Sequence, residues 1–415
     1  MEVSKILIIE RMYKQMALSN DEIKDLMSKT NEAQKPMEET TTIVNSKESN
    51  ATTAAVSRNL LVIGCGDGGC NIASTIRDRI PDVRVIAYNT SRRAMDSIHA
   101  DVRVIPPAED GSGKVREYSQ DVFKKGSHKH ILHYVNDFIT NIPNLEYIVV
   151  TSSCDGGTGG GISPRMAKFI ADNVDIPVII VGVYPSINED SMSQYNTLMW
   201  QTEVEKTGLP YMVFDNDGYT GPKNYVHRLV NEDIADAMEV LTGAVYGDTN
   251  IQAIDNRDML MMIQNVGGRI CIYTDDNRPK VNDTLDGYLT ALITNTTEPE
   301  PEGMRAVGLF LKGGDDLINN TDTSLINVRQ QFGNADLMYT HLEISNETRI
   351  SLIATGCASP SKRLSQMRQR YEDIRNTEKV SRDTASDIVK GMENPLGKMK
   401  KKSASTETDF SALDL

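Results

Sequence analysis

The chain has 415 residues, a formal net charge of −14 and a hydrophobic content of 39%. That length accommodates two packed domains with additional polar segments, and the acidity argues against direct, non-specific DNA binding by the body of the protein, because like charge repels phosphates. No apolar run approaches about twenty residues and the first ten residues lack a signal-peptide core, so we expect neither a membrane-spanning helix nor secretion. The five cysteines are scattered, which favours a reduced cytoplasm over a disulfide framework or a zinc site.

The N-terminal segment differs in composition from the rest of the chain. Ile6, Ile9, Tyr13 and Met16 have the spacing of a helix. Residues 30–57 are a mixture of Thr, Ser, Glu, Asn and Ala, which is typical of a flexible linker. We therefore predict that residues 1–58 are an N-terminal helix plus a flexible linker.

A glycine-rich loop follows the first strand predicted after this linker. The apolar run Leu60–Ile63 leads directly into the loop Gly64–Asn71, and a helix is predicted from Ile72 onward. Gly64, Gly66 and Gly69 satisfy the dinucleotide fingerprint G-x-G-x-x-G, so a nicotinamide or flavin enzyme must be considered. On its own this pattern is common and does not decide the function.

Two alternative nucleotide motifs are incomplete. The dinucleotide fingerprint requires an acidic residue about twenty positions further on, but the second predicted strand ends in Asn89–Ser91 without a carboxylate. A Walker-type loop would use Gly113 and Lys114, but Ala108 stands where it needs a glycine and Val115 where it needs Ser or Thr. Neither motif explains the chain.

A second glycine run is the richest feature of the sequence. The predicted strand Tyr147–Val150 precedes Gly156–Gly161, in which Thr158 is the one residue with a side chain. Such a backbone approaches an anion closely and aims several N–H groups at it, and the helix predicted from Ser163 onward adds its positive dipole end. A flexible linker is the alternative, but a strand before the run and an amphipathic helix after it are not typical of linkers. The pattern predicts a phosphate site.

An acidic pair follows the long helix predicted over Tyr225–Val245. Asp255 and Asp258 are three residues apart and share a helical face. Such a pair usually caps a helix start, and it can also act on a reacting group. Both roles can coexist.

The C-terminal half predicts a second domain and a helical arm. Strand-like runs at residues 269–273, 306–311 and 349–354 suggest a mixed sheet with helices, and Leu364, Met367 and Tyr371 have helical spacing. The chain then ends in a charged tail around residues 398–414, which we interpret as a partner-binding arm with a solubilising terminus as the alternative. The expected organisation is 1–58, helix and linker; 59–224, nucleotide-binding domain; 225–264, central helix and acidic loop; 265–360, second domain; 361–415, helix and tail.

Taken together, these glycine loops resemble the tubulin/FtsZ superfamily of GTPases over roughly residues 59–360. Gly156–Gly161 stands where the superfamily has its GGGTGTG signature, with glycine replacing the second threonine. The resemblance implies an α/β, tubulin-like fold: a nucleotide-binding parallel-sheet domain joined by a central helix to a smaller mixed α/β domain. Within the superfamily, Cys70, the Gly111–Lys114 loop and the segment Asn231–Ala237 look more like the TubZ and PhuZ tubulins of bacterial plasmids and phages.

The resemblance also implies the residues that hold GTP or GDP. The loops would surround the phosphates, while His227 stacks on the base and Asn216, Asn231 and Asn71 hydrogen-bond it. Mg²⁺ would arrive with the nucleotide, because the sequence shows no metal-ligating cluster. The expected nucleotide-binding residues are Gly64, Cys65, Gly66, Asp67, Gly68, Gly69, Cys70, Asn71, Asn89, Gly113, Lys114, Gly156, Gly157, Thr158, Gly159, Gly160, Asn216, His227 and Asn231.

The catalytic step implied by the resemblance takes place between two subunits. Asp255 and Asp258 match acidic positions that complete the site of the neighbouring subunit and polarise water for attack on the γ-phosphate. Ala253 replaces the family's asparagine, which puts the rate in question more than the mechanism.

The implied function is a cytoplasmic, GTP-dependent head-to-tail filament of a bacterial host cell that moves or positions plasmid or phage DNA. A DNA-binding adaptor would engage the C-terminal tail, and no membrane partner is expected. The alternatives are an FtsZ-like division polymer, a nucleotide-binding regulator that hydrolyses poorly, and a dinucleotide enzyme that does not polymerise.

Overall fold

The computed structural model describes residues 59–80, 82–106, 111–142, 145–243, 250–252, 254–275, 303–315 and 335–391. The predicted N-terminal helix and linker, Ala253 and the charged tail after residue 391 lie outside the described residues.

Six parallel strands form the first part of the sheet. Apart from the short β3, they consist mainly of buried apolar residues, as expected for strands that are covered on both faces. Their order across the sheet is β3-β2-β1-β4-β5-β6, and every neighbouring pair is parallel. The strands are β1 (Asn59–Cys65), β2 (Arg84–Tyr88), β3 (Val102–Val104), β4 (Leu145–Ser153), β5 (Val178–Tyr184) and β6 (Tyr211–Asp215).

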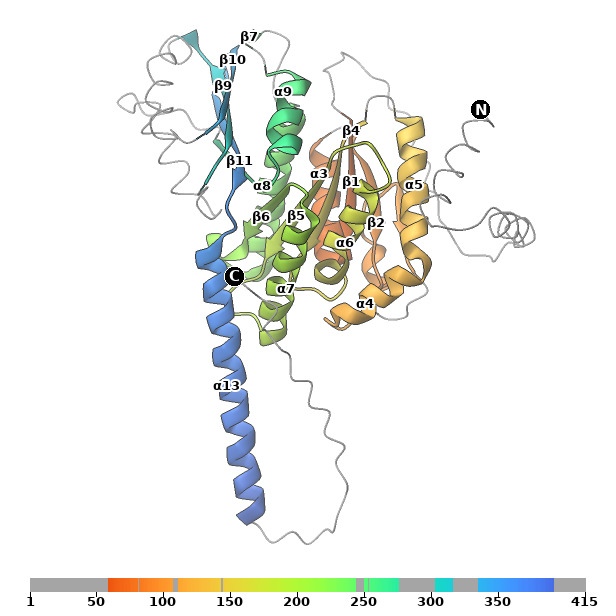
Figure 1. Ribbon diagram of the computed structural model, residues 1–415, viewed down its shortest axis with the longest axis vertical. Helices are drawn as coiled ribbons and strands as arrows, with labels where there is room; N and C mark the ends of the chain where they lie inside the picture. The colour runs from red at the N-terminus through yellow and green to blue at the C-terminus, as the bar shows by residue number, and fades with distance from the viewer. Residues whose placement is uncertain are drawn as a thin grey trace, which may run out of the picture. The chain divides into compact units, whose positions relative to one another are not determined.

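Helices cover both faces of this parallel sheet (Figure 1). Leu60 and Val62 of β1 pack into a core with α3 and α8, whereas Leu61 and Ile63 pack into a second core with α5, α6 and α7. The longer helices are α3 (Gly66–Arg79), α4 (Arg116–Val122), α5 (His128–Asn141), α6 (Gly159–Ala171), α7 (Ser191–Thr207) and α8 (Lys223–Thr242). Short 3-10 or π turns are η1 (Arg93–Met95), η2 (Phe123–Ser127) and η3 (Asn216–Gly218).

The sheet continues into a smaller mixed part. Its strand order is β8-β11-β9-β10-β7, and one parallel register pair, Tyr211 with Arg269, joins it to β6. β9 and β10 are parallel, while β11 is antiparallel to both its neighbours, so the predicted mixed sheet is confirmed. The elements are β7 (Asn250–Gln252), α9 (Asn256–Leu260), η4 (Met261–Asn265), β8 (Arg269–Asp275), β9 (Ala306–Gly313), β10 (Leu337–Ile344) and β11 (Arg349–Cys357).

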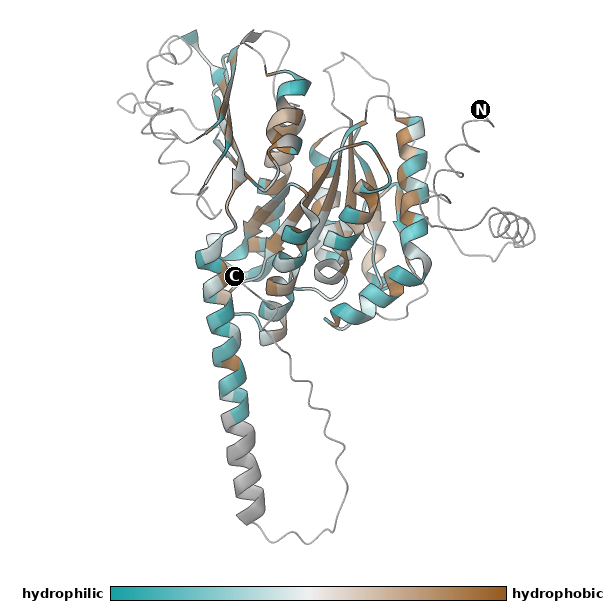
Figure 2. Cartoon of the chain, viewed as in Figure 1, coloured by the Kyte–Doolittle hydropathy of each residue, from teal (hydrophilic) through white to brown (hydrophobic). Residues whose placement is uncertain are grey.

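The last described element is the long helix α13 (Ser361–Gly391). Leu364, Met367 and Tyr371, which the sequence predicts on one helical face, are all buried, and the first two join the core that contains α7. Figure 2 shows apolar residues along the strands and hydrophilic residues along much of α13. Within the described part of the chain, we find no helix with the length and apolar character needed to span a membrane.

The strand order creates a switch point between β1 and β4. These two strands are adjacent and parallel, but α3 leaves β1 toward one face of the sheet and α6 leaves β4 toward the other. In open α/β sheets a crevice forms at the carboxyl ends of such a strand pair, and ligands bind there. The topology therefore indicates where the functional site lies.

Candidate functional site

A cavity of about 360 Å³ lies at this switch point. Its walls come from the ends of β1 and β4 and from the loops that follow β2 and β3. Eleven of the predicted nucleotide-binding residues line it, and the sequence had placed them in four separate loops. They are Cys65, Gly66, Asp67, Gly68, Asn89, Gly113, Lys114, Gly156, Gly157, Thr158 and Gly159.

Two helices begin at the cavity. α3 starts at Gly66 and α6 starts at Gly159, so both helices begin inside the glycine runs rather than at residues 72 and 163, as the sequence pattern predicts. Glycine hides the helical pattern because it has no side chain to contribute to the periodicity. The correction strengthens the phosphate prediction, because the N–H groups of two first helical turns and two positive dipole ends face one cavity.

The glycines of these turns are packed against backbone. A Cβ atom on Gly160 would lie 2.1 Å from the carbonyl oxygen of Cys154, and one on Gly69 would lie 2.2 Å from that of Thr151. A Cβ on Gly66 would lie 2.8 Å from the amide nitrogen of Gly159. The two helix starts therefore touch each other, and no other residue type fits at these positions.

Four predicted residues line neither this cavity nor the smaller one described below: Gly64, Gly69, Cys70 and Gly160. Gly64 and Gly69 pack within the first turn of α3 and against β4. Cys70 is fully buried, and burial raises the pKa of its thiol to about 12. Such a thiol is protonated at neutral pH and acts as a small apolar side chain rather than as a nucleophile or metal ligand. These residues pack behind the loops and do not line the cavity.

Hydroxyl groups join the loops beside the glycines. Thr158 Oγ1 lies 2.7 Å from Thr90 Oγ1 and donates to Ser112 Oγ at 3.2 Å. Asn89 donates to the Asp67 carboxylate. The loops after β1, β2, β3 and β4 are therefore connected at the cavity by side-chain hydrogen bonds.

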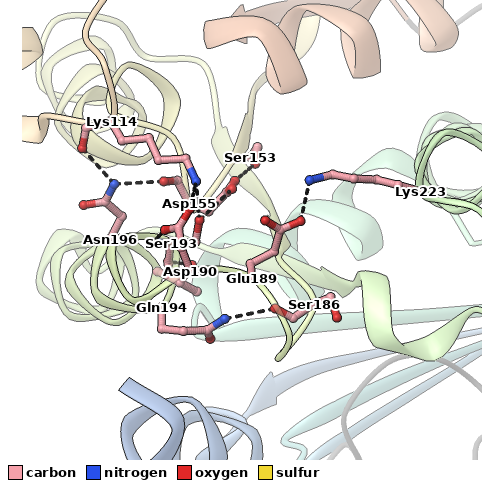
Figure 3. A network of polar contacts seen from close by, with 11 residues as sticks. Lys114, Ser153, Asp155, Ser186, Glu189, Asp190, Ser193, Gln194, Asn196 and Lys223 are labelled. Carbon is pink, nitrogen blue, oxygen red and sulfur yellow. Dashed lines mark hydrogen bonds and ion pairs between the residues drawn. The ribbon is translucent and has the colours of Figure 1, made fainter. Parts of the chain in front are cut away.

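Lys114 is the cation of the cavity. Its backbone φ is 64°, a left-handed conformation that a non-glycine residue rarely adopts and that persists only where neighbours hold it. Its Nζ donates to Asp190 Oδ2 at 2.6 Å and to Ser193 Oγ at 2.7 Å (Figure 3). Burial opposes ionisation of Asp190, but the hydrogen bonds from Lys114 and Ser193 outweigh it, and the pKa of Asp190 lies below its usual value.

The start of α7 connects the loop of Lys114 to the glycine run. Asn196 Nδ2 donates to the carbonyl oxygen of Lys114 at 3.0 Å and to that of Asp155 at 2.8 Å (Figure 3). The loop before α7 also reaches the start of α8, where Lys223 donates to Glu189. These hydrogen bonds connect the loops around the large cavity to the start of α7 and to the loop before it.

A smaller cavity of about 80 Å³ adjoins the first one, and Gly68 and Ser153 line both. All four residues expected to recognise the base line it: Asn71, Asn216, His227 and Asn231. The structure thus brings together residues from α3, η3 and α8.

Two of these side chains have properties suited to a base. The Oδ1 atom of Asn216 is buried and has no hydrogen-bond partner in the structure, which leaves an acceptor for a donor on a ligand. Burial, and then the positive charge of Lys223, lowers the pKa of His227 below its usual value. Its imidazole is therefore neutral at pH 7 and presents a flat ring.

Asp255 and Asp258 form a capping box at the start of α9. Asp255 Oδ1 accepts from the Asp258 amide at 2.8 Å, and Asp258 Oδ2 accepts from the Asp255 amide at 3.3 Å. Neither is among the described residues that line the two cavities. Asp255 is exposed and Asp258 is half-buried, so their carboxylates face solvent while they cap the helix.

Six residues that line the large cavity were not among the sequence-based candidates. Each is adjacent or close in sequence to a predicted residue. They were missed because the sequence pattern does not show how far each loop extends along the cavity. Ser153 and Asp155 precede the second glycine run, and Asp155 accepts from Ser153. The residues are Thr90, Ser91, Gly111, Ser112, Ser153 and Asp155.

Magnesium was expected to come with the nucleotide. Among the residues that the structure describes, no three His, Cys, Asp or Glu side chains are grouped in a way that could hold a metal ion. Protein-bound Mg²⁺ commonly uses one or two carboxylates together with phosphate oxygens and water. Asp67 and Asp155 are the carboxylates that line the large cavity, and they fit that donor set.

Comparison with known proteins shows what the part of the chain around the large cavity is similar to. Residues 59–221 match the model of the Tubulin/FtsZ family, GTPase domain. The tubulin-like protein CetZ2 of Haloferax volcanii is 20% identical over 334 residues, which cover 75% of this chain and 92% of that protein. The tubulin-like protein TubZ of Clostridium botulinum C phage is 27% identical over 165 residues, covering 36% of this chain and 43% of that protein.

A solved structure shows the same fold over most of the chain. The GTPγS-form protofilament of Bacillus thuringiensis serovar israelensis TubZ matches with a TM-score of 0.67 at 14% identity, and the match covers 79% of this chain and 94% of that one. The predicted tubulin-like fold is thereby confirmed. The relatives include CetZ, TubZ and FtsZ proteins rather than one branch. Residues 59–221 match the GTPase domain of the Tubulin/FtsZ family, and this match implies GTP hydrolysis.

Proposed function

We propose that the chain, whose residues 59–221 match the GTPase domain of the Tubulin/FtsZ family, assembles head to tail into filaments and hydrolyses GTP at the contact between subunits. The phosphates of GTP occupy the large cavity, where the first turns of α3 and α6 donate N–H groups and Lys114 supplies a positive charge. Guanine occupies the smaller cavity against Asn216, His227 and Asn231. Mg²⁺ bound to the phosphates would be held by Asp67 and Asp155, and it would neutralise charge on the transferred group.

The observation that carries the proposal is the position of the acidic pair. His227 and Asn231, near the start of α8, line the smaller cavity, whereas Asp255 follows the other end of that helix. α8 has 20 residues and is therefore about 30 Å long. Neither carboxylate is among the described residues that line the cavities of its own subunit, and a second subunit stacked head to tail can present them.

Such a contact joins two different surfaces of the same chain. Heterologous contacts of this kind give open filaments when the rotation between subunits does not close a ring. The solved relatives support this arrangement, because both the Bacillus thuringiensis TubZ and the Haloferax volcanii CetZ2 structures are described as protofilaments. In this arrangement Asp255 and Asp258 polarise the attacking water, and an isolated subunit turns over slowly.

The test measures phosphate release from GTP and from ATP with Mg²⁺ across protein concentrations, alongside pelleting of filaments. We expect a GTP-specific rate that rises above a threshold concentration at which pelleting begins. Asp255→Asn keeps an oxygen that accepts the Asp258 amide, so α9 stays capped while the charge is lost. Its filaments should pellet and release little phosphate. A rate per subunit that is independent of concentration, or an Asp255→Asn protein as active as wild type, contradicts the proposal.

We further propose that the filament moves or positions plasmid or phage DNA through an adaptor bound to its C-terminal tail. The similarity to a phage TubZ supports this role. The test follows inheritance of the DNA molecule that encodes the chain in cells that carry Asp255→Asn. Loss of inheritance with normal cell division supports the proposal, and division failure with normal inheritance favours an FtsZ-like polymer instead.

A further inference from the structure

Arg363 in the first turn of α13 forms a two-pronged ion pair with the end of β6. Its Nε lies 2.5 Å from Asp215 Oδ2 and its Nη2 lies 3.0 Å from Asp215 Oδ1. The arginine side chain is 10% exposed and the aspartate side chain 8%. A paired, buried charge of this kind has a fixed geometry, because the guanidinium fork matches the carboxylate.

The same guanidinium also holds two loops. Arg363 Nη2 donates to Asp217 Oδ2 at 2.6 Å and to the carbonyl oxygen of Pro185 at 3.0 Å. Asp217 belongs to η3, after β6, and Pro185 directly follows β5. Asp217 Oδ2 in turn accepts from the Ile187 amide at 2.8 Å. One side chain of the C-terminal helix therefore fastens the β5–α7 loop to the β6–α8 loop.

Asn216 lies between the two aspartates that Arg363 holds. Asp215 caps the η3 turn by accepting from the Asp217 amide at 3.0 Å, so the backbone on both sides of Asn216 is fixed. Its side chain lines the smaller cavity, and its buried Oδ1 atom has no partner in the structure. An unpartnered acceptor held at this position can receive a hydrogen bond from a donor on the base.

The remainder of the first turns of α13 docks on α7. Leu364 and Met367 join the core beside Leu198 and Trp200, and the rings of Tyr371 and Tyr195 are 6.0 Å apart. Figure 1 shows α13 continuing well beyond this region. Docking of the helix start thus brings Arg363 to the two loops.

We infer that Arg363 is a positioning residue for base recognition, and that docking of α13 sets the preference of the site for guanine. The inference rests on the proposed function, because it requires the base to occupy the smaller cavity. Guanine carries N–H donors at N1 and at the exocyclic 2-amino group, and adenine carries neither, so an acceptor at Asn216 discriminates between them. Removing Arg363 leaves Asp215 and Asp217 close together without a counter-charge, and the turn between them loses its fixed position.

The experiment measures dissociation constants of GTP and ATP by displacement of a fluorescent GDP analogue, together with thermal unfolding. Arg363→Gln should weaken GTP binding by up to about tenfold, the effect of losing one hydrogen bond between the base and Asn216, and leave ATP binding close to wild type. Arg363→Lys, which keeps the charge without the fork, should recover part of the preference. Lys362→Gln is the matched control, since it removes one positive charge from the neighbouring exposed position and should keep the wild-type preference.

The outcomes separate the inference from the proposed function. A folded Arg363→Gln protein with the GTP:ATP preference of Lys362→Gln, or with equal losses for both nucleotides, overturns the role of Arg363. A wild-type protein without any preference for GTP overturns the proposed base site itself. If Arg363→Gln does not fold, Asp217→Asn decides, because it loses only the ion pair between Arg363 and Asp217 and keeps an acceptor for the Ile187 amide. We expect an about threefold loss of preference, and no loss overturns the inference.

Discussion

Replacing Gly157 by alanine should destabilise the protein more than the same replacement at its neighbour Gly156, although the sequence pattern does not distinguish the two glycines. An ideal Cβ on Gly157 would lie 2.4 Å from Ser112 Oγ and 2.7 Å from both the carbonyl carbon of Lys114 and the amide nitrogen of Val115. The serine side chain can rotate away, but the two backbone atoms must retreat by about 1 Å in a close-packed region. At Gly156 the nearest heavy atom to the added Cβ is 4.0 Å away.

Overpacking of this size costs about 1–3 kcal/mol. We therefore expect Gly157→Ala to lower the free energy of unfolding by about that amount, and Gly156→Ala to change it by no more than about 0.5 kcal/mol. Urea unfolding monitored by fluorescence of Trp200, the single tryptophan of the chain and a fully buried residue of α7, measures both. Superimposable unfolding curves for the two variants would refute the contact between the glycine run and the 112–115 loop.

The Gly156→Ala variant also tests where the nucleotide binds. Because Gly156 lines the large cavity and its added methyl group has open space around it, Gly156→Ala places that methyl group where phosphates are proposed to bind. We expect a normally folded protein with weakened GTP binding. Wild-type GTP affinity in Gly156→Ala would show that the phosphates lie elsewhere.

Two further predictions concern Lys114 and His227. We propose that Lys114, which lines the large cavity, donates to the terminal phosphate of GTP. Lys114→Met should then weaken GTP binding by about tenfold more than GDP binding, because that charge-assisted hydrogen bond is lost; equal losses in calorimetric titrations would contradict this. Because burial and Lys223 lower the pKa of His227 below 6.5, the unfolded chain binds more protons than the folded protein as the pH falls through that range, so stability decreases toward acid. His227→Gln should reduce the difference in urea midpoint between pH 7.5 and pH 5.5, and an unchanged difference would rule out this contribution.

Part of the sheet and the location of the glycine-rich loops could be predicted from the sequence. Apolar runs such as Tyr147–Val150 identify buried parallel strands, and both glycine-rich loops follow such a run. The predicted runs at residues 269–273, 306–311 and 349–354 are strands β8, β9 and β11. β10 was not predicted, because its pattern mixes polar residues such as His341 and Glu343, which are buried in this structure.

The contacts between loops could not be predicted from the sequence. Nothing in the pattern around Asp190 indicates that it binds Lys114, because the two residues are 76 positions apart. The same holds for Arg363 and Asp215, which are 148 positions apart. Helix starts were also misplaced, because Gly66 and Gly159 give no periodic signal, whereas their close backbone contacts are visible only in three dimensions.

The most direct test of the shared active site mixes two inactive proteins. Asp255→Asn combined with Asp258→Asn keeps the nucleotide cavities and the helix cap but lacks both carboxylates, whereas Gly156→Leu fills the large cavity and keeps Asp255 and Asp258. If each site is completed by the next subunit, random co-assembly pairs an open cavity with intact carboxylates at about one contact in four. We predict that the mixture releases phosphate at about a quarter of the wild-type rate. Co-pelleting filaments whose rate does not exceed the sum of the separate proteins would contradict the account.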